Sequence, residues 1–288
     1  MPEPAIMAAK QPDLIYDVGM SLAEDTAFYL KKGFRVVAFE AEPSLVQAAR
    51  RRFAEHITVG RLTIVEGAIA DKPAGSSVCF YRCPANSVWG TIDKSWAETR
   101  INLGAAYERL EVPAVSFADS LLTFGVPYYL KIDIVGADMI CLRQMAGLAT
   151  FPDYVSIEAD KTSWEGVLAE VRALVSFGYR DFQAVQQVGV QRLRPPFPAR
   201  EGNYVPHSFP PGASGLFGRE LPERWKDEEG ILREYHQILR LHRWFGDKTV
   251  FRRTKPGGQF LRALSILVRQ PVPGWHDTHA RHSSAAPT

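Results

Sequence analysis

The stretch "IYDVGMSLAED", residues 15–25, decides how the fold of this chain is read. A short apolar run ends at Asp17 and is followed by Gly19. In the next stretch, "AEDTAFYLKKG" (23–33), the apolar residues have the spacing of a helix. A carboxylate buried without a partner costs free energy, so an aspartate at the end of a strand needs a reason. In open α/β sheets ligands bind at the carboxyl ends of strands, and a glycine there allows a close backbone approach. The stretch therefore predicts a strand, a ligand-binding turn and a helix.

Strand and helix signals continue to alternate through the first 195 residues. We predict strands at 13–18, 35–40, 61–71, 76–83, 127–136, 153–160, 179–185 and 189–194, the last two forming a final pair. We predict helices at 23–33, 43–56, 137–147 and 163–178. Repeated strand–helix–strand units form a parallel sheet that is covered by helices on both faces.

The composition changes near residue 194. The stretch "RPPFPAREGNYVPHSFPPGASG" (194–215) is rich in proline and glycine and predicts a loop. A helix is predicted at 228–246, and the tail from about Thr278 is predicted to be disordered, with the histidines of "WHDTHARH" (275–282) in solvent. We therefore expect one domain at 1–195 and a C-terminal loop and helical extension at 196–288.

The overall composition excludes several classes of protein. The chain has 288 residues and a formal net charge of +2, which gives no electrostatic argument for binding nucleic acid or an anionic membrane. No signal peptide is evident, and no apolar run approaches the roughly 18 residues that a membrane span needs. Three cysteines without metal-type spacing suit free thiols in a reducing compartment, so we expect a cytoplasmic protein.

A second acidic residue, Glu40, ends the next predicted strand at "RVVAFE" (35–40). A carboxylate at this place can accept both hydroxyls of a ribose, as in dinucleotide-binding folds. The turn after Gly19 lacks the G-x-G-x-x-G pattern that presents N–H groups to a pyrophosphate, and carries Glu24 and Asp25 instead. Such acidic residues repel phosphates and attract cations, which favours the sulfonium of S-adenosylmethionine over NAD. We expect the turn of "VEGAIAD" (65–71), at Ala68, to contact the adenine.

The stretch "YYLKIDIVGAD" (128–138) carries charges inside a predicted central strand. With a period of two, Lys131 and Asp133 share one face of that strand. We predict that Asp133 binds the ligand or substrate and is the leading candidate for proton acceptor, with Lys131 tuning it or forming a salt bridge. Glu158, which ends the next predicted strand, is the second candidate, and Asp138 is expected in the first turn of a helix, where a carboxylate suits the dipole.

Together these stretches resemble the FkbM family of S-adenosylmethionine-dependent methyltransferases. The matching segments are "DVGMSLAED" (17–25), "VVAFEAEP" (36–43), "AIAD" (68–71) and "KIDIVGAD" (131–138), in the order of the family motifs. The resemblance implies a Rossmann-like, seven-stranded class I methyltransferase sheet with helices on both faces, plus a C-terminal extension. It implies cofactor binding by Asp17, Gly19, Met20, Glu40, Ala41, Ala68 and Asp133, and catalysis by Asp133, Lys131 and Glu158.

Two departures from the family motifs bear on activity. Ala23 stands where the family has a second glycine, and Val135 stands where it has a glutamate. Because the carboxylate at 135 is missing, we predict no metal site there. A changed substrate, or a protein that holds the cofactor without turnover, therefore stays open.

The function that we predict is O-methylation of a hydroxyl on a sugar or natural product. N-methylation of an amine or amide and an NAD-dependent oxidoreductase are the alternatives. The expected partner is a small-molecule acceptor, with no nucleic acid or membrane, and a homo-oligomer is left open. Asn86, Ser87, Trp89 and Trp96 lie in the region 84–107, which we expect to contact the acceptor.

Overall fold

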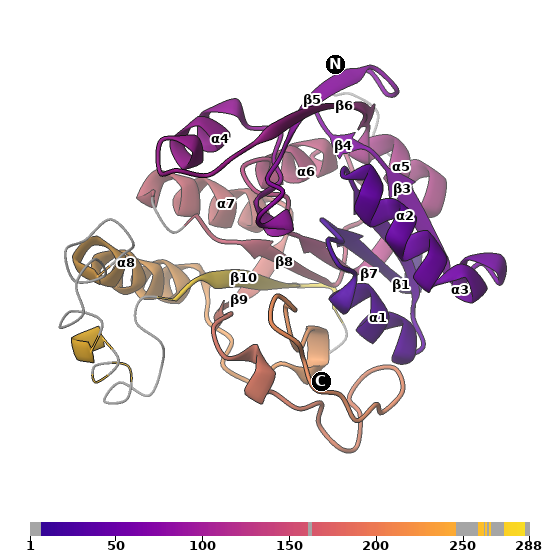
Figure 1. Cartoon of the computed structure of the whole chain (residues 1–288). Helices are drawn as coiled ribbons and strands as arrows, with labels where there is room; N and C mark the ends of the chain where they lie inside the picture. The colour runs from indigo at the N-terminus through magenta and orange to yellow at the C-terminus, as the bar shows by residue number, and fades with distance from the viewer. Residues whose placement is uncertain are drawn as a thin grey trace, which may run out of the picture.

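The structure is a computed structural model that describes residues 7–160, 163–245, 259–261, 263, 265 and 274–285. Seven strands form one sheet in the order β3-β2-β1-β7-β8-β10-β9 (Figure 1). Their bounds are Leu62–Glu66 for β3, Arg35–Glu40 for β2, Lys10–Val18 for β1, Val126–Ile132 for β7, Tyr154–Glu158 for β8, His276–His282 for β10 and Tyr179–Gln186 for β9. The strands pair in parallel except β10, which is antiparallel to both neighbours. The predicted α/β fold with a seven-stranded sheet is confirmed.

Alternate residues of the strands face two separate apolar layers. One layer includes Leu14 and Tyr16 of β1 and packs against four helices, α5 (Phe117–Phe124), α6 (Asp138–Met145), α7 (Trp164–Ser176) and α8 (Glu228–Phe245). The other layer includes Ile15 and packs against α1 (Glu24–Lys31), α2 (Pro43–Arg52) and residues 209–221. Both faces of the sheet are therefore covered, as the continuous apolar runs predict.

A second, three-stranded sheet stands beside the carboxyl edge of the main one. It has the order β4-β6-β5, with β4 at Ala68–Ile69, β5 at Ser77–Arg82 and β6 at Glu108–Val115. The strand predicted at 76–83 is therefore present as β5, but it does not join the main sheet. The connection from β5 to β6 contains the 3-10 turn η1 (Ser87–Trp89) and helix α4 (Lys94–Ile101), two elements that the sequence had not predicted. Helix α3 (Ala54–Thr58) follows α2 after a break at Phe53.

The prediction of a disordered tail from Thr278 is wrong, because residues 276–282 form strand β10, which lies between β8 and β9 in the sheet (Figure 1). Of the histidines of this stretch, His279 is buried at 2% exposed, and His276 and His282 are half-buried. The backbone of β10 bonds to β8 and β9 on its two sides, and the hydroxyl groups of Thr278 and Tyr235 lie 2.6 Å apart.

The predicted pairing of 179–185 with 189–194 is also wrong. Residues Val190–Arg192 form the 3-10 turn η2, and β9 pairs with β10 instead. The division of the chain at residue 195 stays a prediction, although the 196–288 part supplies one strand of the main sheet. Among the described residues, no helix combines the length and apolar character needed to cross a membrane.

Candidate functional site

The turn after β1 brings the ends of two strands into close contact. Gly19 has a φ of +84°, and a Cβ on this residue would lie 1.9 Å from the carbonyl oxygen of Asp133. The backbone N–H groups of Gly19 and Met20 donate to the carbonyl of Phe39 on β2, at 3.1 and 3.0 Å. A glycine is therefore required for this turn to pass the end of β7, which explains the D-x-G pattern physically.

A buried lysine collects three aspartates at this edge. Lys131 Nζ lies 3.1 Å from Asp17 Oδ1, 3.5 Å from Asp25 Oδ2 and 3.9 Å from Asp133 Oδ2. Asp17 is fully buried and also accepts a hydrogen bond from Thr26 Oγ1 at 2.5 Å. Burial works against the charged form of Lys131, but Asp17 and Asp25 outweigh it and hold the lysine pKa well above its usual value. The lysine predicted to pair with Asp133 thus lies closer to Asp17.

Asp25, in the first turn of α1, was noticed in the sequence only as a source of charge. Burial raises the pKa of its carboxyl to about 6, against the opposing effect of the Lys131 ammonium. The backbone N–H of Ser214 donates to both of its carboxylate oxygens, at 3.0 and 3.1 Å. One ammonium therefore faces three carboxylates, and the excess negative charge attracts cations.

Glu40 ends β2 on the far side of the same turn. Its Oε2 accepts the N–H of Ser21 and its Oε1 accepts the N–H of Glu42, each at 2.8 Å. Burial raises the pKa of the Glu40 carboxyl, and the two backbone N–H groups oppose this shift. Each oxygen has a second lone pair, so the carboxylate can still accept hydroxyl groups from a ligand.

A cavity at the carboxyl edge of the sheet brings most of the predicted residues together. Its wall includes, of the predicted set, Gly19, Met20, Glu40, Ala41, Ala68, Lys131 and Asp133. Asp17 lies beneath this wall and holds Lys131, and Ala23 lies outside it. Ala23 has a φ of +60°, a left-handed conformation that costs a non-glycine residue about 1–2 kcal/mol.

Glu158 is placed differently from the other predicted residues. It is half-buried at the end of β8, outside the cavity wall, and pairs in register with Asp277 of β10. Burial raises the pKa of Asp277 well above its usual value, and the charges of Asp133 and Glu158 act in the same direction. Asp138 accepts the N–H of Ile134 at 3.0 Å, and burial raises its pKa to about 7. Asp277 was predicted to lie in a solvated tail, because "HDTHARH" lacks the apolar alternation that is typical of a strand.

The connection between β5 and β6 closes the cavity from the other side. Phe80, Ser87, Val88, Gly90, Thr91 and Ile92 belong to the wall. Thr91 Oγ1 donates to the carbonyl of Val135 at 2.6 Å, which fixes this connection to the end of β7. Trp89 and Trp96 lie outside the wall, and the Arg100 guanidinium stacks over both rings at 4.9 and 4.8 Å. Of the acceptor-binding residues predicted in this region, Ser87 reaches the cavity and Asn86 does not.

Two observations indicate that the cavity suits a positively charged adenosyl compound. Ser21 Oγ is buried with no hydrogen-bond partner among the described residues, and Ser21 belongs to the wall. Glu40 can accept ribose hydroxyls, as described above, while the carboxylates around Lys131 suit a sulfonium or an ammonium. The part of the chain that the structure describes holds no group of three or more His, Cys, Asp or Glu side chains placed to bind a metal ion.

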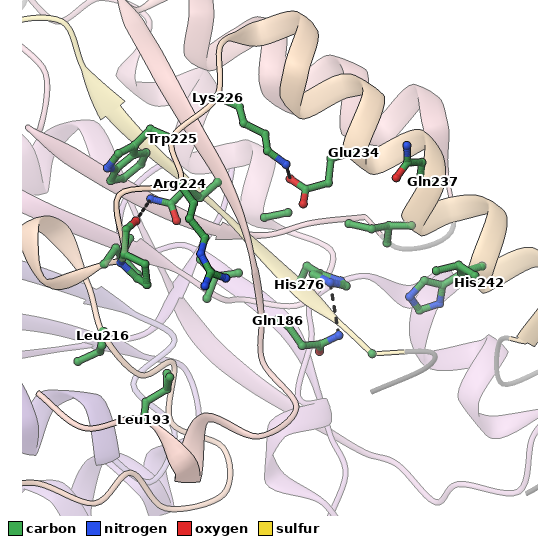
Figure 2. Close-up of a pocket in the computed structure, with 18 residues that line it drawn as sticks. Gln186, Leu193, Leu216, Arg224, Trp225, Lys226, Glu234, Gln237, His242 and His276 are labelled. Atoms are coloured by element: carbon green, nitrogen blue, oxygen red, sulfur yellow. Dashed lines mark hydrogen bonds and ion pairs between the residues drawn. The ribbon is translucent and has the colours of Figure 1, made fainter. Parts of the chain in front are cut away.

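A larger cavity of about 690 Å³ lies beside β9, between α8 and the segment 216–226. Figure 2 shows Trp225 and Arg224 on one side of it and His276 and Gln186 on another, with the ion pair of Lys226 and Glu234 near α8. Burial lowers the pKa of His276 to about 4, so this side chain is neutral at pH 7. None of the predicted site residues lines this cavity, so the motifs point to the first one.

Comparison with known proteins gives a family for the chain. The family model for the methyltransferase FkbM domain matches residues 16–181, whereas no curated protein matches the chain. Similar solved structures include the methyltransferase FkbM of Methylobacillus flagellatus KT (17% identity, TM-score 0.36, covering 62% of this chain and 41% of that chain). Others are the precorrin-6y C5,15-methyltransferase of Geobacter metallireducens GS-15 (14%, 0.33, 63% and 72%) and a SAM-dependent methyltransferase of Aquifex aeolicus (11%, 0.30, 62% and 77%). Since the family model spans more than half of its residues, the chain belongs to the FkbM family of methyltransferases.

Proposed function

We propose that this methyltransferase uses S-adenosylmethionine and methylates a hydroxyl group of a small molecule, a sugar or a natural product. The observation that carries the proposal is the cavity at the carboxyl edge, where Gly19, Glu40 and Asp133 meet around an excess of negative charge. The acidic turn after β1 argues against NAD, because a pyrophosphate would be repelled there.

Each end of the cavity has its own role. Glu40 accepts the ribose hydroxyls, and the backbone at Ala41 and Ala68 contacts the adenine. Asp25 and Asp17, with Lys131 between them, provide the negative field for the amino-acid and sulfonium part. Gly19 and Met20, in the turn after β1, line the cavity and contact the cofactor in this proposal.

Asp133 is proposed as the proton acceptor because its side chain is 42% exposed, whereas Asp17 and Asp25 are buried. The bound cofactor supplies a methyl group on a positively charged sulfur, already activated for displacement. When an acceptor hydroxyl takes up this methyl group it must lose its proton, and the Asp133 carboxylate would accept that proton. Lys131, whose Nζ lies 3.9 Å from Asp133 Oδ2, keeps this carboxylate oriented. Glu158 remains the second candidate, and its place outside the cavity wall favours Asp133 over it.

Calorimetric titration with S-adenosylmethionine, S-adenosylhomocysteine and NADH tests the cofactor. We expect the two adenosyl compounds to bind and NADH not to bind; the reverse result would favour an oxidoreductase. A methyl-transfer assay over a panel of hydroxyl and amine acceptors then tests the reaction. Methylation of amines alone would replace O-methylation by N-methylation, and cofactor binding without turnover on either class would favour a binding protein.

A further inference from the structure

A segment beyond the family-model match runs back across helix α1. We call residues 201–221 the strap. At one end of the strap, Glu201 accepts a hydrogen bond from Tyr128 Oη of β7. Lys32, which follows α1 and is fully buried, donates to the carbonyl of Asn203 at 3.2 Å and forms an ion pair with Glu220 at 2.7 Å. The two ends of the strap are thus anchored to the same residue, Lys32, and Glu201 is also bonded to β7.

Aromatic packing fixes the middle of the strap. The ring of Phe217 lies 4.8 Å from the ring of Tyr129 and 5.0 Å from that of Tyr29. The ring of Phe209 packs edge-on against Phe28 at 4.9 Å. These contacts bury the strap against α1 and β7, so its position is set by the core.

The turn between these anchors reaches the proposed cofactor cavity. Gly212 belongs to the cavity wall, and two residues later the N–H of Ser214 donates to both oxygens of Asp25. Asp25 is itself a wall residue, 4% exposed, and lies 3.5 Å from Lys131. The strap therefore supplies both a part of the wall and the hydrogen bond that holds one of the three carboxylates.

We propose that the turn 212–214 of the strap is part of the cofactor site and that Ser214 is a positioning residue, whose N–H holds Asp25 ionised and aimed at the cationic end of S-adenosylmethionine. The proposal rests on the cofactor assignment made above. A buried carboxylate is stabilised in its charged form by backbone N–H donors, and this bond opposes the burial that favours the neutral acid. The strap lies outside residues 16–181, so the family model does not assign it a role.

The test replaces Ser214 by proline, because proline removes the N–H. Ser214→Ala keeps the N–H and removes only the hydroxyl, which also interacts with Asp25, so S214A should bind more tightly than S214P. The matched control is Ser208→Pro, the same change at an exposed residue of the strap whose N–H bonds to no other described residue. In calorimetric titration of the full chain with S-adenosylhomocysteine, we expect S214P to bind roughly tenfold or more weakly and S208P to stay within about twofold, since a hydrogen bond to a charged group is lost. Wild-type affinity in S214P would overturn the proposal, whereas failure of the wild-type chain to bind would overturn the cofactor assignment itself.

A pH series separates positioning from general damage. Without the Ser214 N–H, Asp25 takes up a proton more readily, so the loss of affinity should grow from pH 8 to pH 6; a loss equal at both pH values would overturn the proposal. The charged and titratable groups that face Asp25 are Asp17, Tyr29, Tyr129, Lys131 and Asp277. If S214P does not fold, hydrogen exchange on the wild-type chain tests whether the turn 212–214 contacts the ligand. Peptides spanning 208–216 should gain protection at saturating S-adenosylhomocysteine, and unchanged exchange there would contradict the proposal.

Discussion

Replacing Lys131 by methionine tests the electrostatic core of the site. Methionine keeps most of the apolar stem but removes the ammonium that lies 3.1 Å from Asp17 and 3.5 Å from Asp25. Removing one partner of a buried ion pair costs about 3–5 kcal/mol, because the other charge stays buried without compensation. Asp17 keeps its bond from Thr26 and Asp25 keeps its bond from Ser214, so we expect a loss near the lower end, about 3 kcal/mol of unfolding free energy at pH 8.

The same variant makes a prediction about pH. The pKa of Asp25 is raised to about 6, and without Lys131 it rises further. A carboxyl whose pKa is higher in the folded state binds more protons when folded, so its cost appears as the pH rises and fades as the pH falls. The loss in Lys131→Met should therefore shrink to about 1–2 kcal/mol at pH 5.

Urea unfolding followed by circular dichroism measures both values. The matched control is Lys226→Met, since Lys226 pairs with Glu234 at 2.9 Å but is 40% exposed. Exposed pairs contribute about 0–1 kcal/mol, so this control should change little at either pH. A loss below about 1 kcal/mol in Lys131→Met at pH 8, or the same loss at both pH values, would refute the reasoning.

Three further predictions concern the cofactor, the chemistry and the sheet. Glu40→Gln should weaken S-adenosylhomocysteine binding by about 10- to 100-fold in calorimetry, because one charged acceptor is lost, whereas Glu66→Gln, the cross-strand neighbour on β3, should leave it unchanged. Asp133→Asn should lower kcat by about 100-fold or more with little change in cofactor affinity, and equal losses in both would make Asp133 a cofactor ligand instead. Burial lowers the pKa of His279 to about 3, so the folded state binds fewer protons and stability is lost as the pH falls below 6.5. His279→Leu should remove about 1 kcal/mol per pH unit of this dependence between pH 6 and 4 in urea unfolding, and an unchanged slope would contradict it.

The residues at the ends of the first two strands could be predicted to lie together, because the sequence signal there is local. An aspartate and a glycine after the first strand, and a glutamate after the second, are readable because strand, turn and helix follow each other directly. The cavity brings Gly19 and Glu40 together as expected, and the period of two correctly put Lys131 on the same face as Asp133. The closer partner of Lys131, Asp17, comes from the neighbouring strand, and pairing across strands is not visible in one segment.

The missed elements depend on contacts between distant parts of the chain. The segment of strand β10 was predicted to be a solvated tail because "HDTHARH" lacks apolar alternation. In the structure, the Thr278 hydroxyl bonds to that of Tyr235 on α8, and the backbone pairs with β8 and β9. Ser214 contacts Asp25 through its backbone N–H as well as its side chain, and a contact between residues so far apart in sequence gives no local signal. Residues 194–215, which include most of the strap, were predicted to be a proline- and glycine-rich loop. The anchoring of the strap was not predicted, because Tyr128 and Lys32 lie far away in sequence.

The place of β10 has a consequence for how this protein reaches its native state. Strands β8 and β9 cannot be neighbours in the finished sheet, since the antiparallel strand 276–282 lies between them. During folding, β8 and β9 must therefore leave room for one strand between them, or separate again, until residues 276–282 pair with both. Contacts of such long sequence separation form slowly. Chains shortened before residue 276 should therefore expose two unpaired strand edges, a ready template for aggregation.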